Sequence, residues 1–197
     1  MTDRSEKRTY GALILAGGAG RRMGGQNKAL LRLDDRTFLA RLEEALAGFE
    51  EKLISIRDAS WLADTGFTPV VDAVAGRGPL EGLRCALQLC RSDVLVVVPC
   101  DVPLFSAELA QALMHAGAAH DAVICRDRTG KLDPLCGVYS KKCLPVIESL
   151  MAQEKYRVMN VFERVDGAVF ALDTAGLSDD LLTNVNFPET LKELRGD

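Results

Sequence analysis

Histidine is scarce in this chain of 197 residues: only His115 and His120 are present, and neither stands beside an obvious serine or cysteine nucleophile. We therefore expect no Ser-His or Cys-His catalytic arrangement. The six cysteines form no C-x-x-C pair and mostly lie inside apolar runs, which favours buried reduced thiols over a zinc site. The chemistry of this chain is therefore expected to need neither a nucleophilic side chain nor a cysteine-bound metal.

The chain also lacks a long apolar run and an excess of basic residues. Its formal net charge is −4, which indicates no basic surface for nucleic acid, and no apolar run approaches the length of a membrane span. Residues 1–8 are polar, do not resemble a signal peptide, and are expected to be a disordered terminus. A composition of 48% hydrophobic and 26% charged residues is ordinary for a globular protein, and the length suits one domain over residues 1–197. Because reduced thiols are typical of the cytosol, we expect the protein to be cytoplasmic.

Glycine, in contrast, is concentrated in one stretch, residues 13–28, which reads LILAGGAGRRMGGQNK. A short apolar run that ends in glycines is typical of a buried parallel strand followed by a tight loop. Backbone N–H groups in such a loop can bind an anion, and Arg21, Arg22 and Lys28 add positive charge there. The stretch predicts a triphosphate-binding loop; the alternative is an exposed glycine turn with solvated arginines.

Two common glycine motifs do not account for this loop. The dinucleotide pattern G-x-G-x-x-G would need a glycine at position 23, where the chain has Met23. The P-loop pattern G-x-x-x-x-G-K-[ST] reaches Gly25, but Gln26 and Asn27 follow it. Neither motif is therefore present in this loop.

The remaining pattern alternates short apolar segments with helical ones, which predicts an α/β fold. Strands are expected at residues 10–16, 53–56, 68–71 and 94–98, and a helix at residues 36–47 with Gly48 at its C-cap. Asp72 and Asp101 follow two of these strands, at the sheet edge where ligands of open α/β sheets bind. Asp101 is our candidate ligand for Mg²⁺; the alternative is that it caps a turn before Pro103.

The glycine loop, LAGG-x-x-RRMGG-x-x-K, resembles the signature loop of the molybdenum cofactor guanylyltransferases, the MobA family. Four later elements resemble family segments in the same order: GPLEG, PCDVP, YRVM and NVNFPE. The resemblance implies a three-layer α/β/α, Rossmann-like nucleotidyltransferase fold with a mostly parallel sheet. One departure stands out, because this chain has Asn27 where the family usually has aspartate.

The resemblance also implies an activity: transfer of GMP from GTP to molybdopterin, or to its molybdenum-bearing form, with release of pyrophosphate and a requirement for Mg²⁺. An anionic acceptor phosphate needs no general base, which agrees with the scarcity of histidine. Arg22, Lys28 and Asp101 would be catalytic, and Asp101 would hold the metal. The residues expected to contact GTP are Leu15, Ala16, Gly17, Gly18, Lys28, Asp72 and Asp101.

The pterin side of the site is expected to use Arg157, Asn184 and Asn186, which lie late in the chain, away from the nucleotide elements. The alternative for the asparagines is that they only cap the last helix. Family members also carry an asparagine after the second strand, and residues 53–58 contain none, so that contact stays open. Molybdoenzymes or their chaperones are expected as downstream partners.

Three rival functions remain at this point. A cytidylyltransferase acting on the same cofactor usually has alanine at the position of Gly17 or Gly18. A sugar-phosphate nucleotidyltransferase should lack the closing segment of residues 184–189. A cofactor-binding delivery protein without activity is supported only by Asn27, while Lys28 and Asp101 argue against it.

Overall fold

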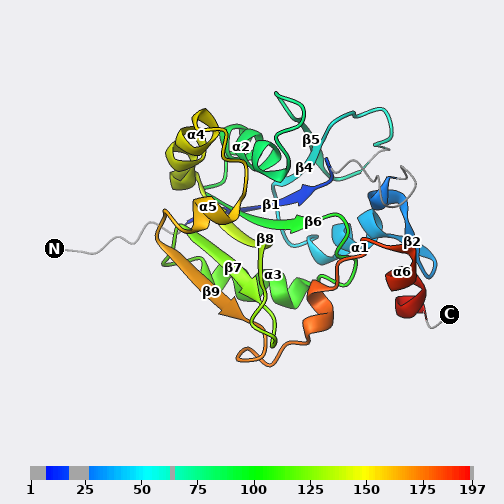
Figure 1. The fold of residues 1–197 in the computed structure, drawn as a ribbon. Helices are drawn as coiled ribbons and strands as arrows, with labels where there is room; N and C mark the ends of the chain where they lie inside the picture. The colour runs from blue at the N-terminus through cyan, green and yellow to red at the C-terminus, as the bar shows by residue number, and fades with distance from the viewer. Residues whose placement is uncertain (1–7, 18–26, 63–64, 196–197) are drawn as a thin grey trace.

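The computed structural model describes residues 8–17, 27–62 and 65–195 of the chain. Within them a seven-stranded sheet has the order β5-β4-β1-β6-β8-β7-β9, and β8 is the only one of the seven that runs antiparallel to its neighbours (Figure 1). The strands are β1 (Tyr10–Leu15), β4 (Lys52–Ile56), β5 (Thr68–Val71), β6 (Val94–Pro99), β7 (Ala122–Arg126), β8 (Leu132–Ser140) and β9 (Gly167–Ala171). The predicted α/β class with a mostly parallel sheet is confirmed.

The apolar runs of β1 and β6 lie at the centre of this sheet, where both faces are covered. Alternate residues of a strand point to opposite faces, so Ile14 packs into one hydrophobic core and Leu13 into the other. The central pair is in register, with Ile14 opposite Val98 and Leu15 opposite Pro99. The loops that follow both strands therefore emerge side by side at one edge of the sheet.

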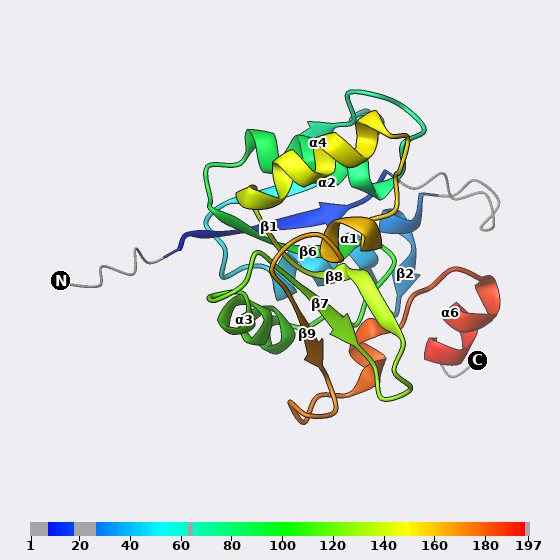
Figure 2. The same ribbon diagram turned by 60° about the vertical axis from the view of Figure 1, so that its left-hand side comes forward.

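Helices cover both faces of the sheet and complete the expected three layers (Figures 1 and 2). The core on one face includes leucines of α1 (Phe38–Ala45) and α3 (Ala107–Ala116). The core on the other face includes residues of α2 (Pro79–Leu89), α4 (Leu144–Ala152) and α5 (Met159–Phe162). No helix in the described part of the chain is long and apolar enough to span a bilayer.

A small hairpin and the last helix form a third core beside the sheet. Strands β2 (Arg32–Leu33) and β3 (Arg36–Thr37) pair with each other, and α6 (Pro188–Arg195) packs nearby. This core contains Leu33, Phe38, Val185 and Leu191. The C-terminal segment is thereby held against the region that follows the glycine-rich stretch.

The predicted boundaries of the first helix, residues 36–47, are wrong at both ends. Arg36 and Thr37 pair with β2, and the Thr37 hydroxyl accepts a hydrogen bond from Ala40 N at 3.1 Å, so the helix begins at Phe38. It ends at Ala45 with Leu46 as its C-cap, and Gly48 therefore does not cap it. Pairing with a neighbouring strand, which helical periodicity does not report, sets the start of this helix.

Candidate active site

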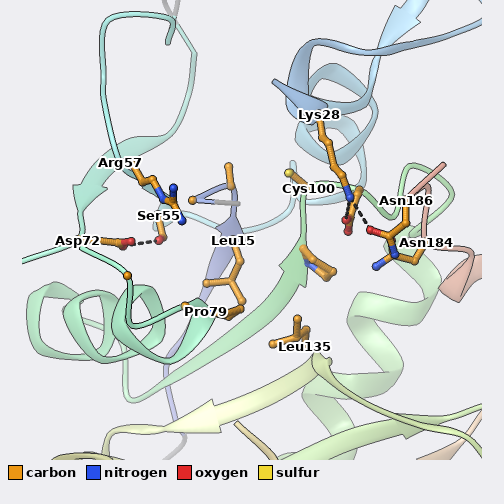
Figure 3. Close-up of a pocket in the computed structure, with 16 residues that line it drawn as sticks. Leu15, Lys28, Ser55, Arg57, Asp72, Pro79, Cys100, Leu135, Asn184 and Asn186 are labelled. Atoms are coloured by element: carbon orange, nitrogen blue, oxygen red, sulfur yellow. Dashed lines mark hydrogen bonds and ion pairs between the residues drawn. The ribbon is translucent and has the colours of Figure 1, made fainter. Parts of the chain in front are cut away.

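A pocket of about 700 Å³ lies at the carboxyl ends of β1, β4 and β6 (Figure 3). Of the residues proposed from the sequence, those that line it are Leu15, Ala16, Gly17, Lys28, Asp72, Asp101, Asn184 and Asn186. Gly18, Arg21 and Arg22 lie outside the described residues. Asp72 and Asp101, which were expected at the ends of two strands, therefore line the same pocket.

One end of the pocket is built around the ammonium group of Lys28. Lys28 begins a short 3₁₀ helix (Lys28–Leu30), which Asn27 caps by accepting a hydrogen bond from Ala29 N at 3.1 Å. The Lys28 Nζ donates to Asp101 Oδ2 at 2.7 Å and to Asn186 Oδ1 at 2.5 Å. The side chains of Lys28 and Asp101 are only 16% and 14% exposed, so water screens this ion pair little.

Two buried oxygen atoms at this end have no hydrogen-bond partner among the described residues: Asp101 Oδ1 and Asn184 Oδ1. Val185 N donates to Asp101 O at 2.8 Å, which holds the segment of Asn184 beside Asp101. Asn184 lies beside Asn186 and near the end of the Lys28 side chain (Figure 3). Buried polar atoms without partners are costly, and a carboxylate and an amide oxygen are hard ligands suited to Mg²⁺. These residues fit such an ion. The described residues contain no group of three or more metal-binding side chains, so substrate oxygens or water would complete its coordination.

At the other end of the pocket, Ser55 in β4 and Asp72 after β5 are joined by a hydrogen bond. Ser55 Oγ donates to Asp72 Oδ1 at 3.1 Å. Burial raises the pKa of Asp72, the repulsion of Glu81 adds to that effect, and the Ser55 hydrogen bond and the charge of Arg57 oppose it. A Cβ atom on Gly82 would lie 2.1 Å from Ser55 Oγ, so only glycine at this position of α2 permits such a close approach.

Ser55 and Arg57 are lining residues that sequence reasoning did not assign. They stand two residues apart, so they share a face at the end of β4. The signal in the sequence was a polar residue inside an apolar strand, followed by a basic residue just after it. That signal is weak without knowledge that β4 pairs with β5.

The loop before α2 is fixed by Glu81, a fully buried carboxylate. Its Oε1 accepts hydrogen bonds from Val74 N at 3.1 Å and from Arg84 Nη2 at 2.7 Å. Gly78, with φ of 68°, precedes Pro79 at the start of the helix, and both line the pocket. The second glycine-rich element, GPLEG, therefore forms part of the pocket wall.

The two asparagines proposed for the pterin side lie in the same pocket as the residues proposed for the nucleotide side. Asn184 and Asn186 line the same cavity as Lys28 and Asp101, because α6 and its preceding segment fold back over the hairpin. Arg157 is exposed and lies in a different hollow of about 420 Å³, on the segment between α4 and α5. Which ligand each of the three contacts stays a prediction.

Comparison with known proteins identifies the family. A family model described as the MobA-like NTP transferase domain matches residues 12–168, which is most of the chain. The chain belongs to the MobA-like NTP transferase family. The matched residues include Lys28, Asp72 and Asp101, so the pocket described above is the pocket of a MobA-like domain.

Relatives and solved structures agree with this membership. A Methanosarcina mazei protein named probable molybdenum cofactor guanylyltransferase is 34% identical, over 98% of this chain and 93% of its own. The molybdopterin-guanine dinucleotide biosynthesis protein A of Archaeoglobus fulgidus superposes with a TM-score of 0.76 at 21% identity, covering 94% of this chain and 96% of that one. A 2-C-methyl-D-erythritol 4-phosphate cytidylyltransferase of Thermus thermophilus has a TM-score of 0.71 at 12% identity. The match covers 95% of this chain and 98% of that one. These two structures show that this MobA-like chain shares its fold with proteins named for different substrates.

Proposed function

We propose that this protein transfers GMP from GTP to molybdopterin, or to molybdenum-bearing molybdopterin, and releases pyrophosphate. The similarity to the Methanosarcina mazei protein over nearly the full chain supports the reaction class. The observation that carries the proposal is the Lys28–Asp101 ion pair beside two unpartnered buried oxygens, inside a pocket large enough for a nucleotide. In such a site the positive charge of Lys28 would attract the triphosphate, and the negative charge of Asp101 would attract its metal.

The residues of the chain would act by alignment and charge. Lys28 has an ammonium group with three N–H bonds and uses two of them on Asp101 and Asn186, so one remains for a phosphate oxygen. Its positive charge would stabilise the negative charge that develops on the departing pyrophosphate. The acceptor phosphate is already an anionic nucleophile, so no side chain has to remove a proton.

Asp101 Oδ1 and Asn184 Oδ1 are the atoms that would hold Mg²⁺. When bound there, Mg²⁺ would supply Lewis-acid stabilisation of charge on the α-phosphate. Asp101 Oδ2 stays paired with Lys28, which fixes the orientation of the carboxylate.

We expect Asp101→Asn to weaken metal binding and activity together, because the substitution removes the one negative charge that the protein would contribute to the cation. The measurement is a titration with Mn²⁺ followed by its paramagnetic resonance signal, in the presence of GTP. Asp35→Asn, at an exposed position, is the matched control. An unchanged Mn²⁺ titration in Asp101→Asn would show that the metal is held elsewhere.

The proposed reaction is tested by supplying purified protein with Mg²⁺, molybdopterin and equal concentrations of GTP and CTP. We expect release of pyrophosphate and a product that carries GMP, identified by mass spectrometry. A product that carries CMP would make the protein a cytidylyltransferase. Absence of pyrophosphate with both nucleotides would favour a delivery protein.

A further inference from the structure

The end of the pocket remote from Lys28 carries the exposed side chain of Arg57. Arg57 follows β4 and lines the pocket, and among the described residues it makes no hydrogen bond and no ion pair within 4 Å. Its side chain is drawn beside Ser55 and Asp72 in Figure 3. An arginine in a cavity with unused donors can bind an acceptor group of a ligand.

Strand pairing places Arg57 next to Asp72. Ser55 pairs with Val70 and Ile56 with Val71, and Asp72 N then donates to Ile56 O at 3.2 Å. Continuing this register by one residue sets Arg57 against Asp72 on the face that carries Ser55. The position of Arg57 is thus set by the sheet, as is that of Asp72.

Both side chains also lie close to Gly17. A Cβ atom built on Gly17 would lie 3.3 Å from Asp72 Oδ2 and 3.9 Å from Arg57 Cγ. A side chain at position 17 would crowd Asp72, so glycine keeps open the space of the pocket that these side chains line. That space has a hydrogen-bond acceptor, Asp72 Oδ2, and a hydrogen-bond donor, the Arg57 guanidinium, at its border.

This acceptor and donor match the edge of guanine. Guanine presents two adjacent N–H donors, N1–H and N2–H, next to the acceptor O6. A carboxylate can accept from both N–H groups, and a guanidinium beside it can donate to O6. Cytosine and adenine lack two adjacent N–H donors beside a carbonyl, so they would leave part of this pair unsatisfied.

We propose that Arg57 is a specificity-determining residue that donates a hydrogen bond to O6 of the guanine base, while Asp72 accepts from N1–H and N2–H. This inference rests on the proposed function, because it assumes that GTP is the nucleotide bound. It assigns Arg57 to the contact left open by the absence of an asparagine in residues 53–58. The charge of Arg57 also lowers the pKa of Asp72 against the effect of burial, which helps the carboxylate remain an acceptor.

The test is binding of three nucleotides, GTP, 6-thio-GTP and ITP, to the wild-type protein and to Arg57→Ala by calorimetry with Mg²⁺. 6-Thio-GTP replaces O6 with a poor acceptor, and ITP lacks the 2-amino group. We expect Arg57→Ala to weaken GTP binding by about 10- to 100-fold, the usual effect of losing a hydrogen bond from a charged group. The Arg57→Ala variant should bind 6-thio-GTP as well as it binds GTP. It should still prefer GTP to ITP, because Asp72 is unchanged.

The exposed Arg91, which pairs with Glu51 at a distance of 3.7 Å, provides the control variant Arg91→Ala. An equal loss of affinity for all three nucleotides in Arg57→Ala would overturn the inference, because it would assign Arg57 to the phosphates. The inference would also be overturned if Arg57→Ala still bound GTP more tightly than 6-thio-GTP, as the wild-type protein is expected to do. A separate titration of the wild-type protein with CTP tests the proposed function itself, which tighter binding of CTP than of GTP would refute.

Discussion

Lys28 is the residue on which the proposed chemistry depends most. It contacts Asp101 on the loop after β6 and Asn186 before α6, so one ammonium group joins three separate segments. We expect Lys28→Ala to lower kcat by about 10²–10³, the usual effect of losing one preorganised electrostatic contact. The fold should change much less, because the hydrophobic cores do not include this side chain.

Steady-state kinetics and a thermal melt of the same preparation measure these two effects. Lys142→Ala is the control, since the Lys142 side chain is 72% exposed and makes only a 3.5 Å surface contact with Asp121. Near-normal turnover in Lys28→Ala would contradict the role assigned to the ammonium group.

Single residues of the site differ in how well the sequence predicts them. Lys28 and Asp101 were predictable, because a glycine loop and a carboxylate after a buried strand are local patterns. Ser55 and Arg57 were not, since a side chain at a strand end enters the pocket only through pairing of β4 with β5. The placement of Asn186 beside Lys28 depends on a contact between residues 158 positions apart.

At the scale of elements, apolar runs predicted the central strands well and the borders of the sheet less well. Strands β4 and β6 agree with their predicted ranges to within one residue. Strand β8 is longer than the apolar run at its end, because it begins at Leu132 and includes Asp133 and Pro134. Strand β8 pairs antiparallel with both β6 and β7. The backbone hydrogen bonds of this pairing extend the strand beyond the residues that the apolar pattern indicates.

The junction between α2 and β6 depends on Glu51, which precedes β4. Its carboxylate accepts hydrogen bonds from Arg91 N and Ser92 N, each at 2.8 Å, and from Ser92 Oγ at 2.5 Å. Burial alone would raise the pKa of Glu51, but these hydrogen bonds and the charge of Arg91 outweigh it and lower the pKa. The ionised carboxylate therefore stabilises the fold above the ordinary pKa of about 4.5, and that stability is lost as the pH falls through the lowered value.

We expect Glu51→Ala to reduce the free energy of unfolding at pH 7 by about 1.5–3 kcal/mol, the range for hydrogen bonds to a charged group. The difference from the wild type should shrink as the pH falls below the ordinary glutamate value. Urea unfolding at pH 7 and in acid measures both quantities, with the exposed neighbour variant Glu50→Ala as control. The same loss at both pH values would contradict the role of the charge.

For the whole molecule, the layered cores determine how the six cysteines behave. All six are free; Cys85 is half-buried and the other five are buried. Burial raises the pKa of Cys90 and of Cys143 to about 11, and that of Cys100 to about 12. Thiols with these pKa values carry little thiolate at neutral pH, and the thiolate is the reactive form.

We expect a disulfide reagent to titrate no more than one thiol per chain in the native protein, that of Cys85, and all six in denaturant. Replacement of Cys85 by serine should remove the native reaction. Rapid modification of two or more thiols without unfolding would contradict the packing of the two main cores.

The sheet also sets the overall layout of the site, because β1, β4 and β6 end at one edge. The Ser55–Asp72 pair lies at one end of the pocket and Lys28 at the other (Figure 3). There Lys28 pairs with Asp101. The most direct measurement is a crystal structure of the protein with Mg²⁺ and α,β-methylene-GTP, which resists cleavage at the reacting bond. It should show guanine beside Asp72, phosphates at Lys28, and the metal on Asp101 Oδ1. A nucleotide bound outside this pocket, or a metal that does not contact Asp101, would contradict the proposed site.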